Sequence, residues 1–287
     1  MTRASRTGLV SVILPTCDRV ELLRRCVKSV AAQTHRELEI VIVDDASLDS
    51  TKSALEWIIR EDSRVRFTSL RTRSGPQVAR NTAISLCRGK FITNIDDDDE
   101  MLPNRVAALL AGFNESTSLV CSGFFRKSDK SNQRVHCTNE IITLDKQLST
   151  NRVGNSALTL RERIVKVGLF DEDMPAWQDY DLWTRIITQF GPGLRLREPT
   201  LVVHLDHESP RVSRKTLQGA EQFLLKHQHL MQTKHIRRQY LEAFFLSEKK
   251  MSFNDFVRHI SLDNAAKVIR YFITSNLPSV RQLRLRI

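Results

Sequence analysis

Runs of consecutive apolar residues alternate with helical patterns over the first third of the chain. Such runs cover residues 9–14 and 38–43, which lack the polar alternation of a strand with one wet face, and further strands are predicted at 65–70 and 91–95. Between the runs, apolar residues recur every three or four positions, as they do on one face of a helix. This order of elements predicts an α/β fold with a mostly parallel central sheet that helices cover on both faces.

Signals for the ends of helices accompany this pattern. Asp18 followed by Glu21 predicts a capping box at the start of the helix after the first strand. Pro103 is expected to open a helix that ends near Gly112, and a later helix is expected to end near Phe190. Each strand of the predicted sheet is therefore followed by its own connecting helix.

The second half of the chain is less regular. Residues 126–153 are polar and hairpin-like, and 201–203 form a short apolar strand. From residue 216 onward nearly every segment has a helical pattern. We therefore predict an α/β domain over 1–213 and a helical extension over 214–287.

Composition places the chain among globular proteins. It has 287 residues, of which 41% are hydrophobic and 27% charged. Five scattered cysteines, none in a CxxC pair, predict free thiols rather than disulfides or a zinc site. The apolar runs are shorter than a membrane-spanning helix requires, and the first residues are polar, so we expect a cytoplasmic protein.

The positive charge is concentrated at one end. The net charge is +11, and the segment from Arg211 to the end holds 15 Lys and Arg against 5 Asp and Glu. The body of the chain is therefore close to neutral, and the helical extension is basic.

Three polar loops follow strands of the predicted sheet, at 15–19, 44–47 and 96–100. In an open parallel sheet, ligands bind at the carboxyl ends of the strands, so these loops are expected to meet. Two of the loops are acidic, and crowded carboxylates are stabilised by a cation. An oxygen donor set suits Mg²⁺ or Mn²⁺, which commonly share their coordination with a substrate diphosphate. The sequence thus predicts a metal and diphosphate site.

Structural roles for these acidic residues remain open at this point. Asp96 to Asp99 would also serve as the acidic first turn of the helix at Pro103. Asp44 and Asp45 would also serve as a cap before a helix at Thr51. For Asp96 to Asp99, the position after an apolar strand favours the functional interpretation. For Asp44 and Asp45, the functional and structural interpretations are evenly balanced.

Several ordered motifs resemble the amino-terminal half of family 2 glycosyltransferases, of the type that makes bacterial surface polysaccharides. The match is dense over 9–112 and looser over 154–213. The motifs are Val10-Ser11-Val12-Ile13-Leu14-Pro15-Thr16, Glu39-Ile40-Val41-Ile42-Val43-Asp44-Asp45-Ala46-Ser47, Ala79-Arg80-Asn81, Arg88-Gly89-Lys90-Phe91-Ile92 and Ile95-Asp96-Asp97-Asp98-Asp99.

The resemblance implies a glycosyltransferase A-type, Rossmann-like fold and a nucleotide-sugar donor, with a preference for UDP. It divides the first domain into a nucleotide-sugar-binding half, 9–112, and an acceptor-binding half, 113–213. It also implies a metal-binding DxD motif, matched by Asp96-Asp97-Asp98, and Mn²⁺ or Mg²⁺ as the cofactor.

The same resemblance implies roles for individual residues at the donor site. Pro15, Thr16 and Asp45 are expected against the base and ribose. Asp97 is expected to reach the ribose, and Asp98 to hold the metal. Further expected contacts of the nucleotide sugar are Asp18, Arg80, Asp96 and Arg211, with His207 as a second metal ligand in the closing loop of the domain.

Residues 177–183 are similar to the family's acceptor-site segment, (E/Q)D-x-D-L-W. A sugar hydroxyl is a weak nucleophile, so it needs a carboxylate that takes its proton, and Asp179 is the expected base. Trp177 and Gln178 are the expected acceptor contacts, and Asp181 is expected to be structural. The alternative for Asp179 is the cap of the helix that ends near Phe190.

The basic extension carries no nucleic-acid-binding motif. The resemblance to transferases that act on lipid-linked acceptors implies that it binds an anionic membrane surface on the inner leaflet, and the alternative is a solvated helical face. The predicted function is the metal-dependent, inverting transfer of a sugar to a hydroxyl of a glycan or lipid-linked saccharide, in polysaccharide or cell-envelope glycan synthesis. The alternatives are a sugar-phosphate nucleotidyltransferase and a non-catalytic nucleotide-sugar-binding module. The sequence leaves the oligomeric state open.

Overall fold

A computed structural model describes residues 8–48, 51–205, 216–246, 250–260 and 264–277. The chain divides into two units. We call the first, residues 1–147, 151–173 and 178–209, the sheet unit. We call the second, residues 148–150, 174–177 and 210–287, the helical unit.

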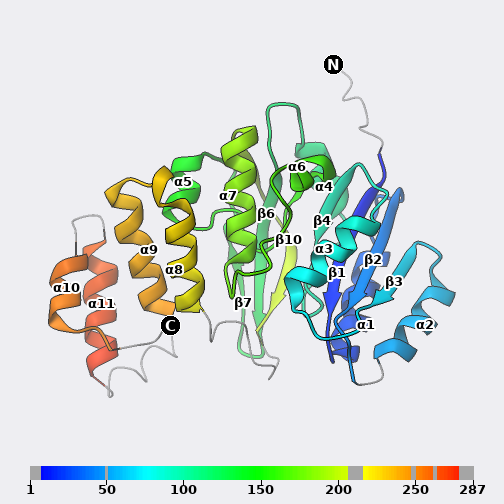
Figure 1. The fold of residues 1–287 in the computed structure, drawn as a ribbon, viewed down its shortest axis with the longest axis horizontal. Helices are drawn as coiled ribbons and strands as arrows, with labels where there is room; N and C mark the ends of the chain where they lie inside the picture. The colour runs from blue at the N-terminus through cyan, green and yellow to red at the C-terminus, as the bar shows by residue number, and fades with distance from the viewer. Residues whose placement is uncertain (1–7, 49–50, 206–215, 247–249, 261–263, 278–287) are drawn as a thin grey trace. The chain divides into compact units, whose positions relative to one another are not determined.

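The first 204 residues contain ten strands and seven α-helices among the residues described (Figure 1). The strands are β1 (Val10–Thr16), β2 (Leu38–Asp44), β3 (Val65–Ser69), β4 (Phe91–Asn94), β5 (Glu100–Met101), β6 (Val120–Ser128), β7 (Ser131–Val135), β8 (Glu140–Ile142), β9 (Leu158–Leu160) and β10 (Gly193–His204). The helices are α1 (Val20–Ala31), α2 (Thr51–Glu61), α3 (Pro76–Leu86), α4 (Arg105–Gly112), α5 (Leu144–Ser149), α6 (Arg161–Lys166) and α7 (Gln178–Phe190).

All ten strands join one mixed sheet with the order β3-β2-β1-β4-β9-β6-β10-β5. β7 pairs with β6, and β8 pairs with β10, outside this path. The first four strands along the chain are parallel to one another, and β6 is parallel to β10. β9 is antiparallel to both of its neighbours and joins the two parallel parts. The predicted parallel arrangement is confirmed for the first half, and the later strands make the whole sheet mixed.

Helices cover both faces of the sheet, as the apolar runs predicted. Every residue of β1 is buried, and alternate side chains enter different cores. Val12 packs in the core under α1, α2 and α4, whereas Ile13 packs in the core under α3, α6 and α7. A strand that is buried on both faces has no wet side, and this explains why its sequence lacks polar alternation.

The predicted capping box at Asp18 is wrong. Helix α1 begins at Val20, and no side chain caps it. Asp18 has a φ of 52°, and its carboxylate accepts a hydrogen bond from the Leu48 amide at 2.6 Å and pairs with Arg73. The side chain therefore ties together the loops that follow β1, β2 and β3, which local sequence does not reveal.

The helical unit has its own hydrophobic core. The side-chain amide of Gln239, which is fully buried, donates to the carbonyl of Leu148 at 2.6 Å. Its elements are α8 (Thr216–His227), the short 3₁₀ helix η2 (Gln228–Leu230), α9 (Thr233–Leu246), α10 (Phe253–His259) and α11 (Ala265–Asn276). The core contains Leu241, Met251, Val268 and Tyr271, with Phe244, Phe245, Phe256, Ile260 and Phe272 packed against it. Within the described residues, no helix is both long and apolar enough to cross a bilayer.

Candidate active site

The carboxyl ends of β1, β2 and β4 meet at one edge of the sheet. β1 pairs with β2 through Thr16 and Asp44, and with β4 through Ile13 and Asn94. The next residue of the β2 loop, Asp45, donates its amide to the Thr16 carbonyl at 2.9 Å. The three polar loops that the sequence singled out are therefore neighbours, as expected for parallel strands.

Asp97 faces the loop after β1. Its carboxylate accepts a hydrogen bond from the Thr16 hydroxyl at 2.8 Å, and it pairs with Arg19 at 3.1 Å. Burial raises its pKa to about 6, although Arg19 and the Thr16 hydroxyl act in the opposite direction. Asp97 is thus tied to the β1 loop, where the predicted donor contact Thr16 lies.

The other three aspartates of the run converge. Carboxylate oxygens of Asp96, Asp98 and Asp99 all lie within 4.8 Å of one another. Asp99 is only 2% exposed, and its pKa lies well above its usual range because of burial and the charges of Asp96 and Asp98. Crowded carboxylates of this kind form a hard oxygen donor set, which fits a divalent cation such as Mg²⁺ or Mn²⁺.

Asp99 is held by residues far away in the sequence. The side-chain amide of Asn155 donates to one carboxylate oxygen at 3.1 Å, and the backbone amide of His204 donates to the other at 3.3 Å. The His204 imidazole lies 2.6 Å from Glu100. Sequence reasoning missed Asn155, Glu100 and the role of Asp99 in this cluster, because nothing local separates Asp99 from the aspartates before it.

A buried arginine connects this cluster to helix α7. Arg80 is 3% exposed, and its guanidinium pairs with Asp96 at 2.6 Å. Its other two guanidinium nitrogens are buried and have no hydrogen-bond partner among the described residues. Burial lowers the pKa of Arg80, but the charges of Asp179 and Asp96 outweigh it and raise that pKa above its usual value. Arg80 therefore supplies one positive charge to two carboxylates.

Asp179 is the second residue of α7. Its Oδ1 is shielded from solvent and has no hydrogen-bond partner in the described part of the chain. Burial raises its pKa to about 7, with Arg80 opposing the shift and Asp96 adding to it. A carboxyl group with a pKa near neutrality is suited to take up and release a proton at physiological pH.

The structural alternative is wrong for Asp179 and for the Asp96 to Asp99 run, whereas Asp44 does hold a turn ahead of α2. The Asp44 carboxylate accepts hydrogen bonds from the Ser47 amide, at 3.2 Å, and from the Ser47 hydroxyl. Asp179 is not an N-cap, because α7 already begins at Gln178. The Asp96 to Asp99 run is not the first turn of α4, because that helix begins at Arg105. Asp45 accepts hydrogen bonds from the amides of Ser74 and Gly75, at 2.7 and 2.9 Å, before helix α3.

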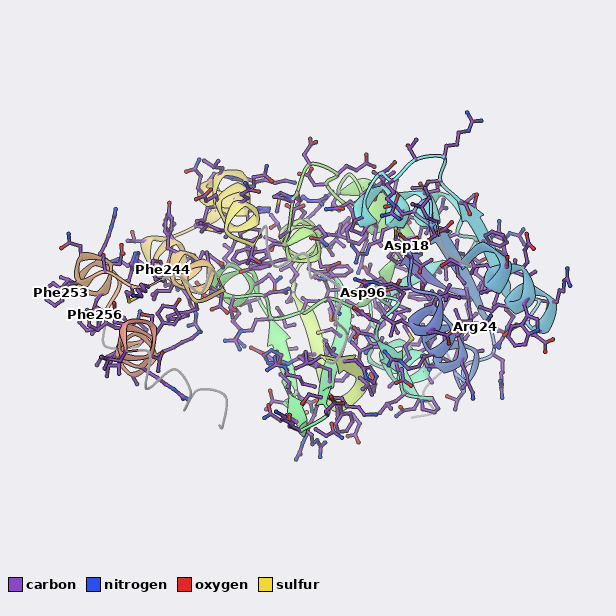
Figure 2. The ribbon with its side chains drawn as sticks, turned by 90° about the horizontal axis from the view of Figure 1, so that it is seen from below. Asp18, Arg24, Asp96, Phe244, Phe253 and Phe256 are labelled. Atoms are coloured by element: carbon purple, nitrogen blue, oxygen red, sulfur yellow. The ribbon has the colours of Figure 1, made fainter. Side chains whose placement is uncertain are left out.

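The remaining site residues of the sequence prediction fall in different places. Pro15 and Gln178 are buried in the sheet unit, and Asp18 is an exposed residue of the loop after β1 (Figure 2). Trp177 belongs to the helical unit, where its ring meets Phe223 edge-on at 5.8 Å. His207 and Arg211 lie outside the described residues.

Two further residues of the acceptor segment are structural. Asp181 is fully buried and pairs with Arg185 at 2.7 Å, and Arg185 also donates to the carbonyl of Leu169. Trp183 is 2% exposed and donates its indole N–H to the Gly154 carbonyl at 3.1 Å. The expected structural role of Asp181 in holding a neighbouring loop agrees with these contacts.

Comparison with known proteins identifies a family. Residues 11–170 match the sequence model of glycosyl transferase family 2. The chain is 28% identical over 276 residues to the glycosyl transferase WcaA of Escherichia coli K12, which is named for colanic acid biosynthesis, covering 91% of this chain and 96% of WcaA. It is 36% identical over 107 residues to a Campylobacter jejuni protein named GalNAc(5)-diNAcBac-PP-undecaprenol beta-1,3-glucosyltransferase, covering 37% of this chain and 35% of that protein.

Solved structures share the fold. TarS residues 1–349 of S. aureus, in complex with UDP-GlcNAc, align with a TM-score of 0.68 at 18% identity, covering 96% of this chain and 83% of that one. The mannosyltransferase PcManGT of Pyrobaculum calidifontis, in complex with GDP-Man and Mn²⁺, aligns with a TM-score of 0.59 at 18% identity. The alignment covers 97% of this chain and 79% of PcManGT. These likenesses establish the glycosyltransferase A-type fold.

Proposed function

The chain belongs to glycosyl transferase family 2, and on that premise we propose that it transfers a sugar from a nucleotide sugar, preferably a UDP-sugar, to a hydroxyl of a glycan or lipid-linked saccharide. The observation that carries the proposal is the chain of charged groups from the Asp96, Asp98 and Asp99 cluster through Arg80 to Asp179. It combines a cation site with a separate carboxylate of near-neutral pKa.

In the proposed reaction, Asp179 takes the proton of the acceptor hydroxyl as that oxygen attacks the anomeric carbon. Attack from the face opposite the nucleotide inverts the anomeric centre in a single displacement. Arg80 holds Asp96 in place and keeps part of the population of Asp179 ionised. Gln178 and Trp177, on either side of the start of α7, are the proposed acceptor contacts.

The donor side of the proposal rests on the β1, β2 and β4 loops. Thr16, Asp45 and Asp97 are proposed to contact the base and ribose, and Pro15, Asp18 and Arg211 remain proposed contacts of the nucleotide sugar. Asp98 and Asp99 are proposed to hold the divalent cation together with Asp96, and His207 remains a proposed ligand. A bound Mn²⁺ or Mg²⁺ would neutralise charge that develops on the departing diphosphate.

The names of the relatives support the acceptor class. WcaA is named for colanic acid biosynthesis, and the Campylobacter protein is named for a PP-undecaprenol-linked saccharide. The loop after β1 reads Cys17-Asp18-Arg19 and contains no glycine, so it lacks the phosphate-binding loop expected of a nucleotidyltransferase. We therefore place the chain in glycan synthesis.

A donor screen tests this function. The full-length protein is incubated with UDP- and GDP-sugars, with Mn²⁺ or with EDTA, and nucleotide release is measured. We expect one donor to release its nucleoside diphosphate, UDP or GDP. An oligosaccharide or lipid-linked acceptor should stimulate this release, and EDTA should abolish it. Equal release in EDTA would contradict the metal dependence. Pyrophosphate formed from a nucleoside triphosphate and a sugar phosphate would instead identify a nucleotidyltransferase.

We also propose that the helical unit binds an anionic membrane surface. Phe253, which Figure 2 labels, and Val257 lie one turn apart on α10. Their side chains are 68% and 57% exposed. On α11, Ile269 and Ile273 are about two fifths exposed, and Arg270 lies beside them. Exposed apolar side chains among basic residues are typical of helices that lie in a membrane interface, where each cation near the surface contributes about 1 kcal/mol.

Flotation with vesicles tests the membrane proposal. We expect wild-type protein to float with vesicles that contain phosphatidylglycerol. The combined change Phe253→Asn and Val257→Asn should weaken binding at least about tenfold, because two exposed apolar side chains that would insert into the bilayer are lost. Leu225→Asn, which changes a residue of α8 that is 68% exposed, is the matched control and should bind as wild type does. Wild-type protein that stays with the bottom fraction at low salt would refute the proposal.

A further inference from the structure

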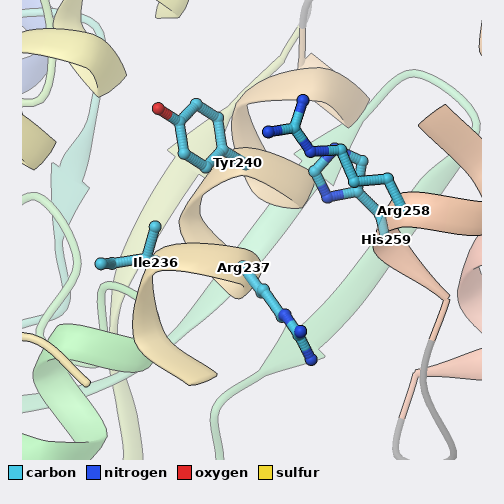
Figure 3. A pocket seen from close by; sticks show the side chains of 5 residues that line it. All are labelled: Ile236, Arg237, Tyr240, Arg258 and His259. Atoms are coloured by element: carbon cyan, nitrogen blue, oxygen red, sulfur yellow. The ribbon is translucent and has the colours of Figure 1, made fainter. Parts of the chain in front are cut away.

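A separate pocket lies within the helical unit, between α9 and α10. It has a volume of about 340 Å³ and is lined by Ile236, Arg237, Tyr240, Arg258 and His259. Figure 3 shows that the first three side chains come from α9 and the last two from α10. Two helices that are separated along the chain by residues 247–252 thus contribute basic groups to one cavity.

The two arginines of this pocket lack an acidic partner. Among the described residues, neither Arg237 nor Arg258 forms an ion pair, and neither guanidinium donates a hydrogen bond. Other arginine side chains of the chain do have acidic partners: Arg64 pairs with Asp62 at 2.6 Å, and Arg185 with Asp181 at 2.7 Å. The pocket therefore presents two positive charges that the described part of the protein leaves uncompensated.

His259 adds a third polar group. Its Nδ1 is buried and has no hydrogen-bond partner in the described residues. Burial lowers the pKa of the imidazole, Asp255 opposes this shift, and the charges of Arg258 and Arg237 lower the pKa further. Both guanidinium groups therefore act on the same imidazole, which places the three cationic or polar groups in one electrostatic environment.

The basic character continues on the other side of α9. A second pocket of about 170 Å³ shares Arg237 and is also lined by Arg238 and Lys267. Its carboxylate, Glu242, is already engaged by Lys267 at 3.4 Å. The surroundings of the first pocket thus reinforce its positive potential.

We propose that the pocket lined by Arg237, Arg258 and His259 binds a phosphate group. Guanidinium groups match phosphate oxygens with paired N–H donors, and two of them from different helices can clamp one anion. The volume exceeds that of a phosphate ion, and Ile236 and Tyr240 offer an apolar wall for an attached organic group. The source is either a soluble phosphate compound or a phospholipid headgroup. The inference goes beyond the transfer reaction, because no residue of the proposed active site contributes to this pocket.

Binding measurements on the full-length protein test the proposal. Titration calorimetry measures inorganic phosphate at low salt, and co-sedimentation measures vesicles of phosphatidylcholine with and without phosphatidylglycerol. The variants are Arg237→Gln and Arg258→Gln, each of which removes one charge from an exposed side chain. Lys250→Gln, which removes one charge from an exposed residue of the helical unit outside the pocket, is the matched control. Urea unfolding confirms that each variant is folded.

We expect each pocket variant to weaken binding at least about tenfold, because each removes a charge-assisted contact, while the control changes it less than about twofold. If inorganic phosphate gives this pattern, a soluble phosphate compound is sufficient as the ligand. The same pattern with phosphatidylglycerol vesicles alone identifies a headgroup. An equal loss in Lys250→Gln would show diffuse attraction to the basic helical unit and overturn the proposal, as would wild-type protein that binds neither probe. No sugar donor is used, so failure of the proposed transfer reaction leaves this test unaffected.

Discussion

Asp179→Asn is expected to lower the rate constant for sugar transfer by about 10²- to 10⁴-fold, the usual contribution of a general base. The amide keeps the size and one hydrogen-bonding oxygen of the carboxyl group but cannot accept the proton of the acceptor hydroxyl. Donor binding should change little, because Asp179 belongs to α7 and not to the loops that carry the proposed donor contacts. Single-turnover transfer and donor affinity, measured side by side, separate these two effects.

Asp173→Asn is the control for this change. Asp173 is exposed, lies six residues before Asp179 and is not part of the proposed site, so its variant should transfer sugar at the wild-type rate. Transfer by Asp179→Asn at a rate within a few-fold of wild type would remove Asp179 from the mechanism. It would leave the donor site, which rests on other residues, unaffected.

The pH dependence follows from the raised pKa of Asp179. A base must be ionised, so kcat/KM for the acceptor should rise with pH on the acid side, towards the pKa of about 7 in the free protein. A cation bound near Asp96 would favour the ionised form and move this limb to lower pH. An acid limb that survives in Asp179→Asn would have to come from another group.

The same pKa predicts an effect on stability. The folded protein holds a proton on Asp179 up to a pH of about 7, whereas the unfolded chain releases it near the ordinary value for an aspartate. The stability that this group contributes is therefore present at low pH and is lost as the pH rises through about 7. Asp179→Asn avoids that loss, so its urea midpoint should exceed that of wild type at pH 8 more than at pH 5.

Asp98→Asn is the second variant with a large expected effect. Loss of one carboxylate from the Asp96, Asp98 and Asp99 cluster should weaken the Mn²⁺-dependent binding of the nucleotide and lower transfer by at least about 100-fold. The physical reason is that a neutral amide oxygen attracts a divalent cation far less than a carboxylate does. Calorimetric titration of UDP with and without Mn²⁺ measures the first effect independently of turnover.

Asp97→Asn offers an informative contrast. Asp97 is bound to Thr16 and Arg19 and lies outside the converging cluster, so its variant should weaken nucleotide binding while keeping the stimulation by Mn²⁺. Glu56→Gln, at an exposed position of α2, should match wild type. If Asp98→Asn kept full Mn²⁺ stimulation and Asp97→Asn lost it, the assignment of the two neighbouring aspartates would have to be exchanged.

Much of the first half of the fold could be predicted because its signals are local. The apolar runs near β1 and β2 identify strands that are buried on both faces, and the helices between them force a parallel order. The arrangement of the later strands was harder to predict from the sequence, because β6 and β10 belong to a mixed region in which β9 runs antiparallel to its neighbours. The failed capping box at Asp18 has the same origin, since Leu48 and Arg73 lie 30 and 55 residues away.

By itself, the sequence determined the family, the order of strands and helices in the nucleotide-binding half, and the types of side chain at the strand ends, because these follow from neighbouring residues. Only the tertiary structure decided that Asp97 faces Thr16 while Asp99 joins Asp96 and Asp98. It also decided that burial raises the pKa of Asp179 and that the guanidinium of Arg80 is the positive charge that opposes this shift. Loop conformation and contacts between distant segments determine which partners each aspartate side chain faces. Neither can be read from a short stretch of sequence.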